Sequence, residues 1–180
     1  MSKVRVLGAP SREWMLRRSS SIGGKMPNGE VNALSVAIRE LAPEHVARVT
    51  YRPAGGERGT HAEIAACFER VRRWMRERGL EARTRTVGVI EARDGRLESY
   101  GCCIRVPGEV ESGSNGVEVV DLPGGRYAVL TMKKDPEVIG PSIGRFYEEY
   151  APRAELRIDA DRPTYEVYLE GTMDYCVPIL

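Results

Sequence analysis

The chain has 180 residues, a length that favours one domain with a sizeable core, and its apolar (42%) and charged (29%) fractions are ordinary for a soluble globular protein. Its 27 basic and 26 acidic residues leave a net charge of +1, which gives no overall electrostatic reason to bind nucleic acid or anionic lipid. The sequence holds no apolar run near the roughly 20 residues of a membrane-spanning helix, and its start lacks the apolar stretch of a signal peptide. We therefore expect a cytoplasmic protein.

The first 45 residues give the weakest pattern in the chain. We expect residues 1–36 to be an N-terminal extension without an assigned role, and residues 37–180 to form the domain. The segment 29–41, GEVNALSVAIREL, favours a short helix, and HVARVTY from His45 onward is typical of a strand.

The clearest predicted helix spans residues 60–78. Thr60 and Glu63 form a capping box at its start, and Gly79 stands where a left-handed C-cap belongs. Its arginines are interleaved with Glu69 and Glu77, which indicates a solvated face and not a nucleic-acid patch. Its apolar side chains recur at i, i+3 and i+4 and predict one buried stripe: Ile64, Cys67, Phe68, Val71, Trp74 and Met75.

The second half of the chain repeats the order of the first. A hairpin is predicted around Asp94-Gly95, a strand at GRYAVLTMKK, a helix over 135–150 with Asp135 as its N-cap, and a closing hairpin around Glu170-Gly171. Strand, helix, strand, strand therefore occurs twice, over about 45–108 and 117–180. This predicts an α+β fold in which the duplicated units form one antiparallel sheet with two helices on one face.

The four cysteines and two histidines predict neither a metal site nor a disulfide. The cysteines form no CxxC motif, and the histidines do not supply zinc-ligand spacing. We expect free, buried thiols in a reducing compartment, no metal and no cofactor. The residues concerned are Cys67, Cys102, Cys103, Cys176, His45 and His61.

The closing hairpin, residues 162–180, carries one acid on each strand, Glu166 and Asp174. A two-residue loop would pair Leu169 with Thr172 and put the two acids on opposite faces. An odd loop with a bulge at Gly171 would put them on the same face and would gather the apolar side chains on the other. We expect the odd loop for that reason.

The face that carries both acids has two interpretations. An antiparallel sheet often has one wet face, so solvent exposure alone explains acids there. Alternatively the face is a ligand groove between the repeats, which would favour cationic or aromatic ligands through charge pairing and cation–π contacts. The residues expected on this face are Thr164, Glu166, Tyr168, Thr172, Asp174 and Cys176. The six residues expected to bind a ligand are Thr164, Glu166, Tyr168, Asp174 and Cys176 of this face together with Tyr51.

Four segments carry a resemblance to a known family: IRELAPEHVARVTYRPAGG, IGPSIGRFYEEYAP, YEVYL and DYCVPI. Over roughly residues 38–180 the chain resembles the GyrI-like domain, the effector-binding domain of AraC-type and MerR-type multidrug-responsive regulators. The resemblance implies the duplicated fold and a central groove for bulky cationic or aromatic molecules. It also implies that the carboxylate within YEVYL, here Glu166, contacts the ligand.

The sequence also departs from the family. Asp174 stands where the family often has a second acid before the final strand, and Cys176 replaces an aromatic residue that often precedes the last Val/Ile-Pro. The long, proline-rich hairpin loop of the family is reduced to Glu170-Gly171. The DNA-binding domain of the regulators has no counterpart in the sequence.

We expect a stand-alone small-molecule binding protein that sequesters or senses its ligand. One alternative that the resemblance implies is a hydrolase of strained electrophilic natural products, with Glu166 and either Tyr168 or Tyr51 as base and acid. No nucleophile–base spacing or metal signature calls for an enzyme, so binding is favoured. A further alternative is a protein-binding module like the gyrase-inhibiting member, which would use the basic first helix and the acidic stretch 148–170.

Overall fold

The computed structural model describes residues 34–53, 61–80, 85–93, 96–108, 110 and 116–180. Most of the expected N-terminal extension, Thr60 of the capping box and the Asp94-Gly95 turn lie outside the described residues. The strands are β1 (Ser35–Leu41), β2 (Glu44–Tyr51), β3 (Thr86–Arg93), β4 (Arg96–Arg105), β5 (Glu118–Leu122), β6 (Gly125–Lys133), β7 (Thr164–Tyr168) and β8 (Thr172–Pro178). The helices are α2 (His61–Arg76) and α3 (Pro136–Arg145), and α3 continues through a π-helical turn, η2 (Phe146–Tyr150), into α4 (Ala151–Arg153).

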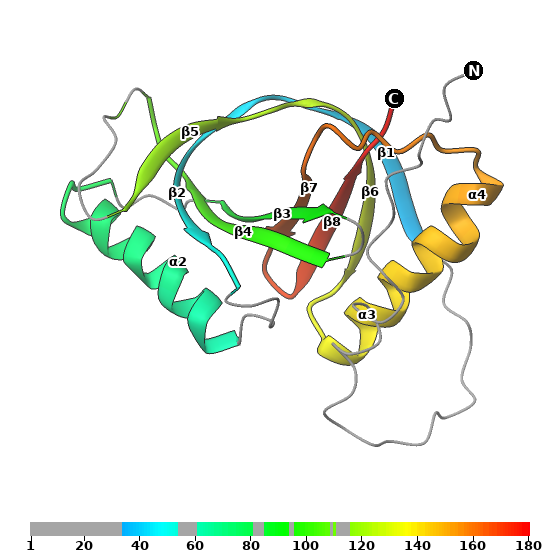
Figure 1. The fold of residues 1–180 in the computed structure, drawn as a ribbon, viewed down its shortest axis with the longest axis horizontal. Helices are drawn as coiled ribbons and strands as arrows, with labels where there is room; N and C mark the ends of the chain where they lie inside the picture. Colours follow the sequence, from blue (N-terminus) through cyan, green and yellow to red (C-terminus); the bar gives the residue numbers. More distant parts are fainter. Residues whose placement is uncertain (1–33, 54–60, 81–84, 94–95, 109, 111–115) are drawn as a thin grey trace.

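All eight strands form one antiparallel sheet in the order β1-β6-β8-β7-β3-β4-β2-β5. Strands β3 and β7 meet at its centre and join the two halves of the chain. In Figure 1, α2 and the α3–α4 helix stand at opposite ends of the same face, which we call the helix face. The predicted α+β fold with both helices on one face is confirmed.

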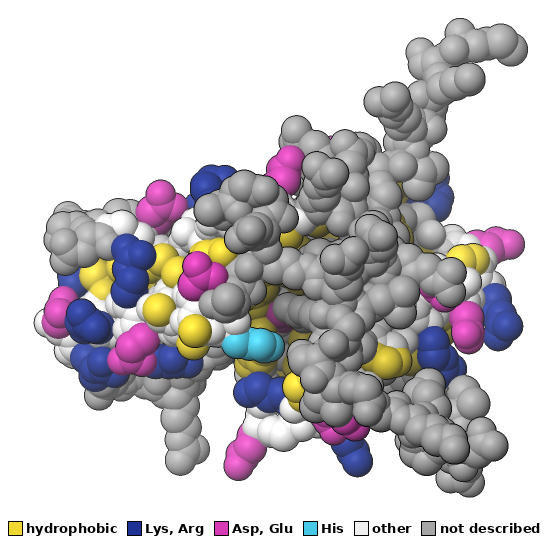
Figure 2. All heavy atoms as spheres, turned by 60° about the horizontal axis from the view of Figure 1, so that its bottom comes forward, with side chains coloured by type: hydrophobic (Ala, Val, Ile, Leu, Met, Phe, Trp, Pro, Cys, Tyr) yellow, Lys and Arg dark blue, Asp and Glu magenta, His cyan; other side chains and the backbone are white. Residues whose placement is uncertain are grey.

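Helix α2 follows its sequence pattern closely. The predicted stripe packs on the sheet, with Val71, Trp74 and Met75 at most 3% exposed. Gly79 adopts the left-handed conformation that ends the helix, with φ of +64°. On the outer side of α2, basic and acidic side chains are interspersed (Figure 2), and Arg76 bonds Glu69 at 2.8 Å. The interpretation of a solvated face therefore stands.

The helix expected at 29–41 is wrong over its described part, because residues 35–41 form strand β1. All seven residues of β1 pair with β6, from Ser35 opposite Thr131 to Leu41 opposite Gly125. As an edge strand, β1 keeps most of its side chains exposed, Ile38 among them at 42%. Its hydrophobic pattern therefore carries little information about its backbone.

Strands β1 and β2 form one long bent strand, and β5 and β6 form another. Together these two bent strands cover the helix-free face of the sheet. β1 runs into β2 across Ala42-Pro43, β6 follows β5 across Pro123-Gly124, and the two pair on both sides of this corner. A side chain at Gly124 would lie 2.7 Å from Pro43 N, so only glycine allows the crossing. Figure 1 shows this ribbon, residues 35–51 and 118–133, arching over the central strands. We call the covered side the ribbon face.

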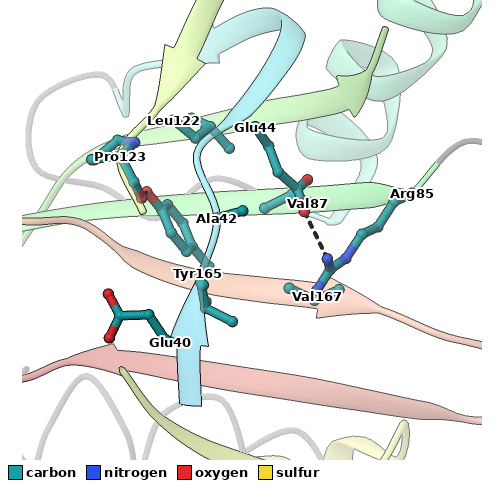
Figure 3. Close-up of a pocket in the computed structure, with 10 residues that line it drawn as sticks. Glu40, Ala42, Glu44, Arg85, Val87, Leu122, Pro123, Tyr165 and Val167 are labelled. Atoms are coloured by element: carbon teal, nitrogen blue, oxygen red, sulfur yellow. Dashed lines mark hydrogen bonds and ion pairs between the residues drawn. The ribbon is translucent and has the colours of Figure 1, made fainter. Parts of the chain in front are cut away.

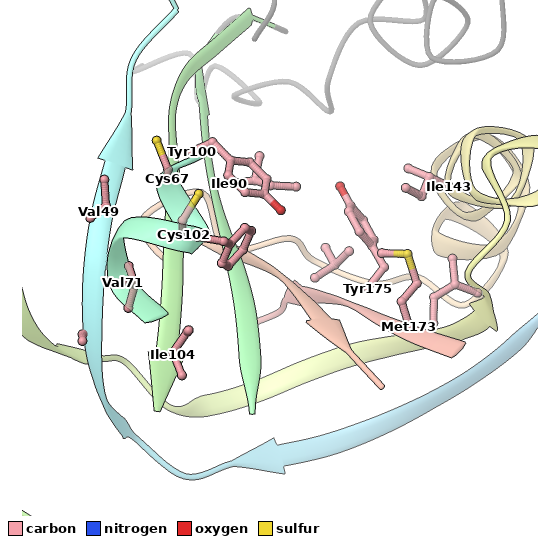
Figure 4. Packing of buried hydrophobic residues seen from close by; sticks show 14 of the residues in the cluster. Val49, Cys67, Val71, Ile90, Tyr100, Cys102, Ile104, Ile143, Met173 and Tyr175 are labelled. Atoms are coloured by element: carbon pink, nitrogen blue, oxygen red, sulfur yellow. The ribbon is translucent and has the colours of Figure 1, made fainter. Parts of the chain in front are cut away.

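The sheet therefore has a hydrophobic core on each face. The larger core lies under the helices and includes Phe68, Tyr100, Phe146 and Tyr175. Figure 4 shows part of it, with side chains of the central strands between α2 and α3. The second core, on the ribbon face, comprises Val46, Val87, Val89, Cys103, Leu122, Tyr127, Val129, Tyr165, Val167 and Cys176.

The odd loop expected in the closing hairpin is wrong. Leu169 N donates to Thr172 O at 3.0 Å across a two-residue turn, in which Gly171 has φ of +72°. Strands β7 and β8 then pair Glu166 with Tyr175 and Val167 with Asp174, which puts the two acids on opposite faces. The apolar side chains need not gather on one face, because both faces of this hairpin are buried.

Candidate ligand site

Glu166 is a buried carboxylate at the centre of the helix face, and only 1% of it is exposed. Its strand, β7, is bonded on both sides, to β3 and to β8. Tyr100 and Tyr168 each donate a hydroxyl hydrogen bond of 2.7 Å to the same oxygen, Glu166 Oε2. The two hydroxyl oxygens are themselves 2.7 Å apart. The carboxylate oxygen and the two hydroxyls thus form a compact triangle.

A glycine makes this triangle possible. Tyr100 belongs to β4, and its side chain must cross β3 to reach Glu166 on β7. The β3 residue directly opposite Glu166 is Gly88, and a Cβ there would overlap the Tyr100 hydroxyl and lie 2.6 Å from Tyr100 Cζ. The missing side chain of Gly88 is therefore the space that the Tyr100 ring occupies.

The environment keeps Tyr100 protonated. Burial raises the pKa of Tyr100 well above its usual value, and the charge of Glu166 raises it further. Tyr100 is therefore a neutral hydrogen-bond donor across the physiological pH range. Its hydroxyl and that of Tyr175 point from the sheet toward the region between α2 and α3 (Figure 4).

Further aromatic residues surround this centre. Phe68 of α2 meets the Tyr168 ring edge-on, with centroids 6.1 Å apart, and Lys134 Nζ lies 5.2 Å from the centre of the same ring. Tyr51 pairs with Tyr100 across β2 and β4. On the α3 side, burial raises the pKa of the Tyr147 phenol, against the opposing effect of its hydrogen bonds to Tyr175 and Thr164. The helix face thus combines one buried carboxylate with several aromatic rings.

The sequence profile of the GyrI-like small molecule binding domain matches residues 35–179. This chain belongs to the GyrI-like family. No curated protein matches the sequence at a significant level.

Solved structures resemble this GyrI-like domain in fold. The EcmrR C-terminal domain has a TM-score of 0.66 at 9% identity and covers 82% of this chain and 98% of its own. An integron cassette protein from Vibrio cholerae has a TM-score of 0.55 at 14% identity, covering 81% and 95%. A hydrolase from Listeria innocua has a TM-score of 0.58 at 13% identity, covering 81% and 91%. At these identities the likeness shows the fold alone.

The GyrI-like domain brings together four of the six residues expected to bind a ligand. Glu166 and Tyr168 are bonded to each other, Thr164 lies on the same face of β7, and Tyr51 reaches this face beside Tyr100. The contribution of Tyr100 was missed. A glycine inside a strand can mark a close approach by another group, and Gly88 was the signal available in the sequence.

Asp174 and Cys176 lie on the ribbon face, so they do not join the other four. Asp174 accepts a hydrogen bond of 2.6 Å from Thr131 Oγ1 and lies 3.9 Å from Arg39. Cys176 is 1% exposed within the second core, and burial raises the pKa of its thiol to about 12. The two-residue turn explains both positions. It shifts the pairing of β8 with β7 by one residue from the expected register, so the side chains of β8 lie on the opposite faces from those expected.

Within residues 34–180, apart from the undescribed gaps, no group of three His, Cys, Asp or Glu residues is placed to hold a metal ion. None of the described helices is long and apolar enough to cross a membrane.

Proposed function

We propose that this GyrI-like domain binds a bulky aromatic cation on the helix face, between α2 and α3, and so sequesters or senses it. The observation that carries the proposal is the buried Glu166 carboxylate, which lies among aromatic side chains. It accepts hydrogen bonds from the uncharged hydroxyls of Tyr100 and Tyr168. A negative charge framed by aromatic rings complements a cation whose own surface is apolar. Membership of a small-molecule binding family supports this assignment.

The contact of Lys134 with Tyr168 supports a preference for cations. The Lys134 ammonium lies 5.2 Å from the centre of the Tyr168 ring, within the roughly 6 Å range of a cation–π interaction. The ring already serves as a cation acceptor within the protein. A ligand cation that packs against Tyr168 would use the same property.

The experiment compares tetraphenylphosphonium with tetraphenylborate, two ions of similar shape and opposite charge, by isothermal titration calorimetry on the full chain. We expect the cation to bind and the anion not to bind. Glu166→Gln should weaken the binding free energy of the cation by about 1–3 kcal/mol, the scale of a lost charge-assisted interaction. The variant should still fold, because the amide oxygen of glutamine can accept from both tyrosine hydroxyls.

Asp174→Asn is the matched control. It removes the second acid of the same hairpin, which is 6% exposed and lies on the ribbon face. Its affinity for tetraphenylphosphonium should equal that of the wild type. Equal affinity in the wild type and Glu166→Gln, or an equal loss in both variants, would contradict the assignment.

A second candidate function, hydrolysis of an electrophilic small molecule, is favoured by one observation. Tyr168 Oη lies 2.7 Å from Glu166 Oε2, so a proton donor and a carboxylate stand side by side. Molecules that stabilise the protein in a thermal-shift screen should therefore be assayed for turnover. Product formation that is lost in both Glu166→Gln and Tyr168→Phe would favour the hydrolase over the binding protein.

A further inference from the structure

A cavity of about 170 Å³ lies on the ribbon face, at the corner where β1 bends into β2. Figure 3 shows the residues that line it, contributed by the bent ribbon and by the central strands β3 and β7. Its apolar wall includes Val87, Leu122, Pro123 and Val167, and Tyr165 closes one side. Tyr165 and Val167 alternate along β7 with Glu166, so the sheet itself separates this cavity from the helix face.

The corner that forms the cavity is held by several fixed contacts. Tyr165 Oη donates to Pro123 O at 2.8 Å, and the Tyr165 ring stacks on Tyr127 with centroids 5.3 Å apart. Arg162 donates to Gly124 O at 3.1 Å and to Ile179 O at 2.7 Å, which ties the corner to the end of β8. The cavity is therefore already shaped before any ligand enters.

The charges that line the cavity sum to −1. Arg85 bonds Glu44 at 2.7 Å, while Glu40, exposed at the mouth, makes no ion pair with any described residue. The nearby Arg162 is bonded to Asp159 at 2.7 Å, and its pKa is raised first by that bond and to a smaller extent by the charge of Glu40, which Arg162 therefore partly offsets. In the described part of the chain, Glu44 Oε2 is also buried without a hydrogen-bond partner. Arg85 Nε is likewise buried without a partner, so the ion pair leaves one unused acceptor and one unused donor at the cavity.

We propose that this cavity is a second ligand site, which takes a small, single-ring aromatic cation with N–H donors. A cavity of roughly 150 Å³ can hold one benzene ring, whereas drug-sized ligands occupy pockets of about 300 Å³ or more. The ring packs between Leu122, Val167 and Tyr165. The cationic N–H groups face Glu40 at the mouth, and the unpartnered Oε2 of Glu44 is the second acceptor on the lining.

The test uses benzamidine, a planar ring with a cationic amidine, against the full chain labelled with ¹⁵N. Neutral benzamide and anionic benzoate are its matched controls in shape. We expect benzamidine at millimolar concentration to shift the backbone amides of Ala42, Val87 and Val167, and the two controls to shift them far less. The absence of saturable shifts with benzamidine would overturn the proposal.

Variants then locate the site. Ala42→Phe places a ring in the mouth of the cavity and should abolish the shifts. Glu40→Gln should lower the affinity for benzamidine about two- to fivefold, the scale of an exposed charge pair. Glu170→Gln, which changes an exposed acid on the hairpin turn that does not line the cavity, should leave the affinity for benzamidine unchanged, and so should Glu166→Gln. Loss of benzamidine in Glu166→Gln, or full binding in both Ala42→Phe and Glu40→Gln, would overturn the second site. Neither result would contradict the binding of the larger cation proposed for the helix face.

Discussion

Replacing Gly88 with alanine should break the hydrogen bond between Tyr100 and Glu166. The new Cβ would overlap the Tyr100 hydroxyl and lie 2.6 Å from Cζ, whereas real Cβ contacts are essentially never below 3.0 Å. The tip of a 2%-exposed ring must therefore shift, and the 2.7 Å bond to Glu166 Oε2 cannot keep its length. Because the ring is rigid and enclosed, the shift strains the core as well as the bond.

The expected loss of unfolding free energy is about 2–5 kcal/mol. A hydrogen bond to a charged group contributes roughly 1.5–3 kcal/mol, and overpacking a core costs about 1–3 kcal/mol. The reduced backbone entropy of the unfolded alanine chain offsets about 0.4–1 kcal/mol of this sum. Gly101→Ala is the control, because its Cβ would lie 3.1 Å from Val89 Cβ and needs only a small adjustment.

Urea unfolding of a double-mutant cycle measures the effect. In a Tyr100→Leu background, which removes the ring tip, Gly88→Ala should cost at least about 1.5 kcal/mol less than in the wild type, the scale of coupling between residues in contact. An equal cost in the two backgrounds would refute the idea that Gly88 is kept open for Tyr100. So would a cost no greater than that of Gly101→Ala.

Three further outcomes are expected. Phe68→Ala should lower the free energy of unfolding by about 3–5 kcal/mol in urea denaturation, because it empties a core aromatic site that is 7% exposed; an unchanged midpoint would contradict the assigned face of α2. The four cysteines are free and buried, and burial raises the pKa of Cys103 and Cys176 to about 12, so a thiol reagent should label almost none in the native protein and all four in urea. The raised pKa of Tyr100 keeps its proton bound in the folded state above pH 10, where the unfolded chain releases it, so stability is full below pH 10 and falls above it by up to about 1.4 kcal/mol per pH unit. Tyr100→Phe should flatten that fall in urea titrations between pH 9 and 11, and an identical slope would count against it.

Elements with one-sided burial could be predicted from the sequence. Helix α2 has one apolar stripe and one charged side, and Asp135 caps α3 by accepting from Glu137 N at 2.9 Å, so a local pattern sufficed for both. The prediction for residues 35–41 failed because β1 lies at an edge of the sheet, where few of its side chains are buried. The hairpin register failed for the opposite reason, since β7 and β8 are buried on both faces and their side chains show no separation of polar from apolar.

The candidate site was only partly predictable. Glu166 and Tyr168 are two residues apart on one strand, so alternation alone places them on the same face. Tyr100 is 66 residues from Glu166 in the sequence, and their contact crosses an intervening strand. That contact depends on the order β4-β3-β7 and on the glycine at the crossing, neither of which a local pattern reports.

The observed register of β7 against β3 is favoured by the contacts of Glu166 itself. A one-residue slip of β7 would carry Glu166 onto the ribbon face, among side chains such as Val87 and Val89, and would bring Val167 beneath Tyr100. A buried carboxylate without hydrogen-bond donors costs several kcal/mol, whereas in the observed register two tyrosine hydroxyls meet it at 2.7 Å. The hydroxyls that make Glu166 a candidate for ligand binding therefore also stabilise the pairing of β7 with β3.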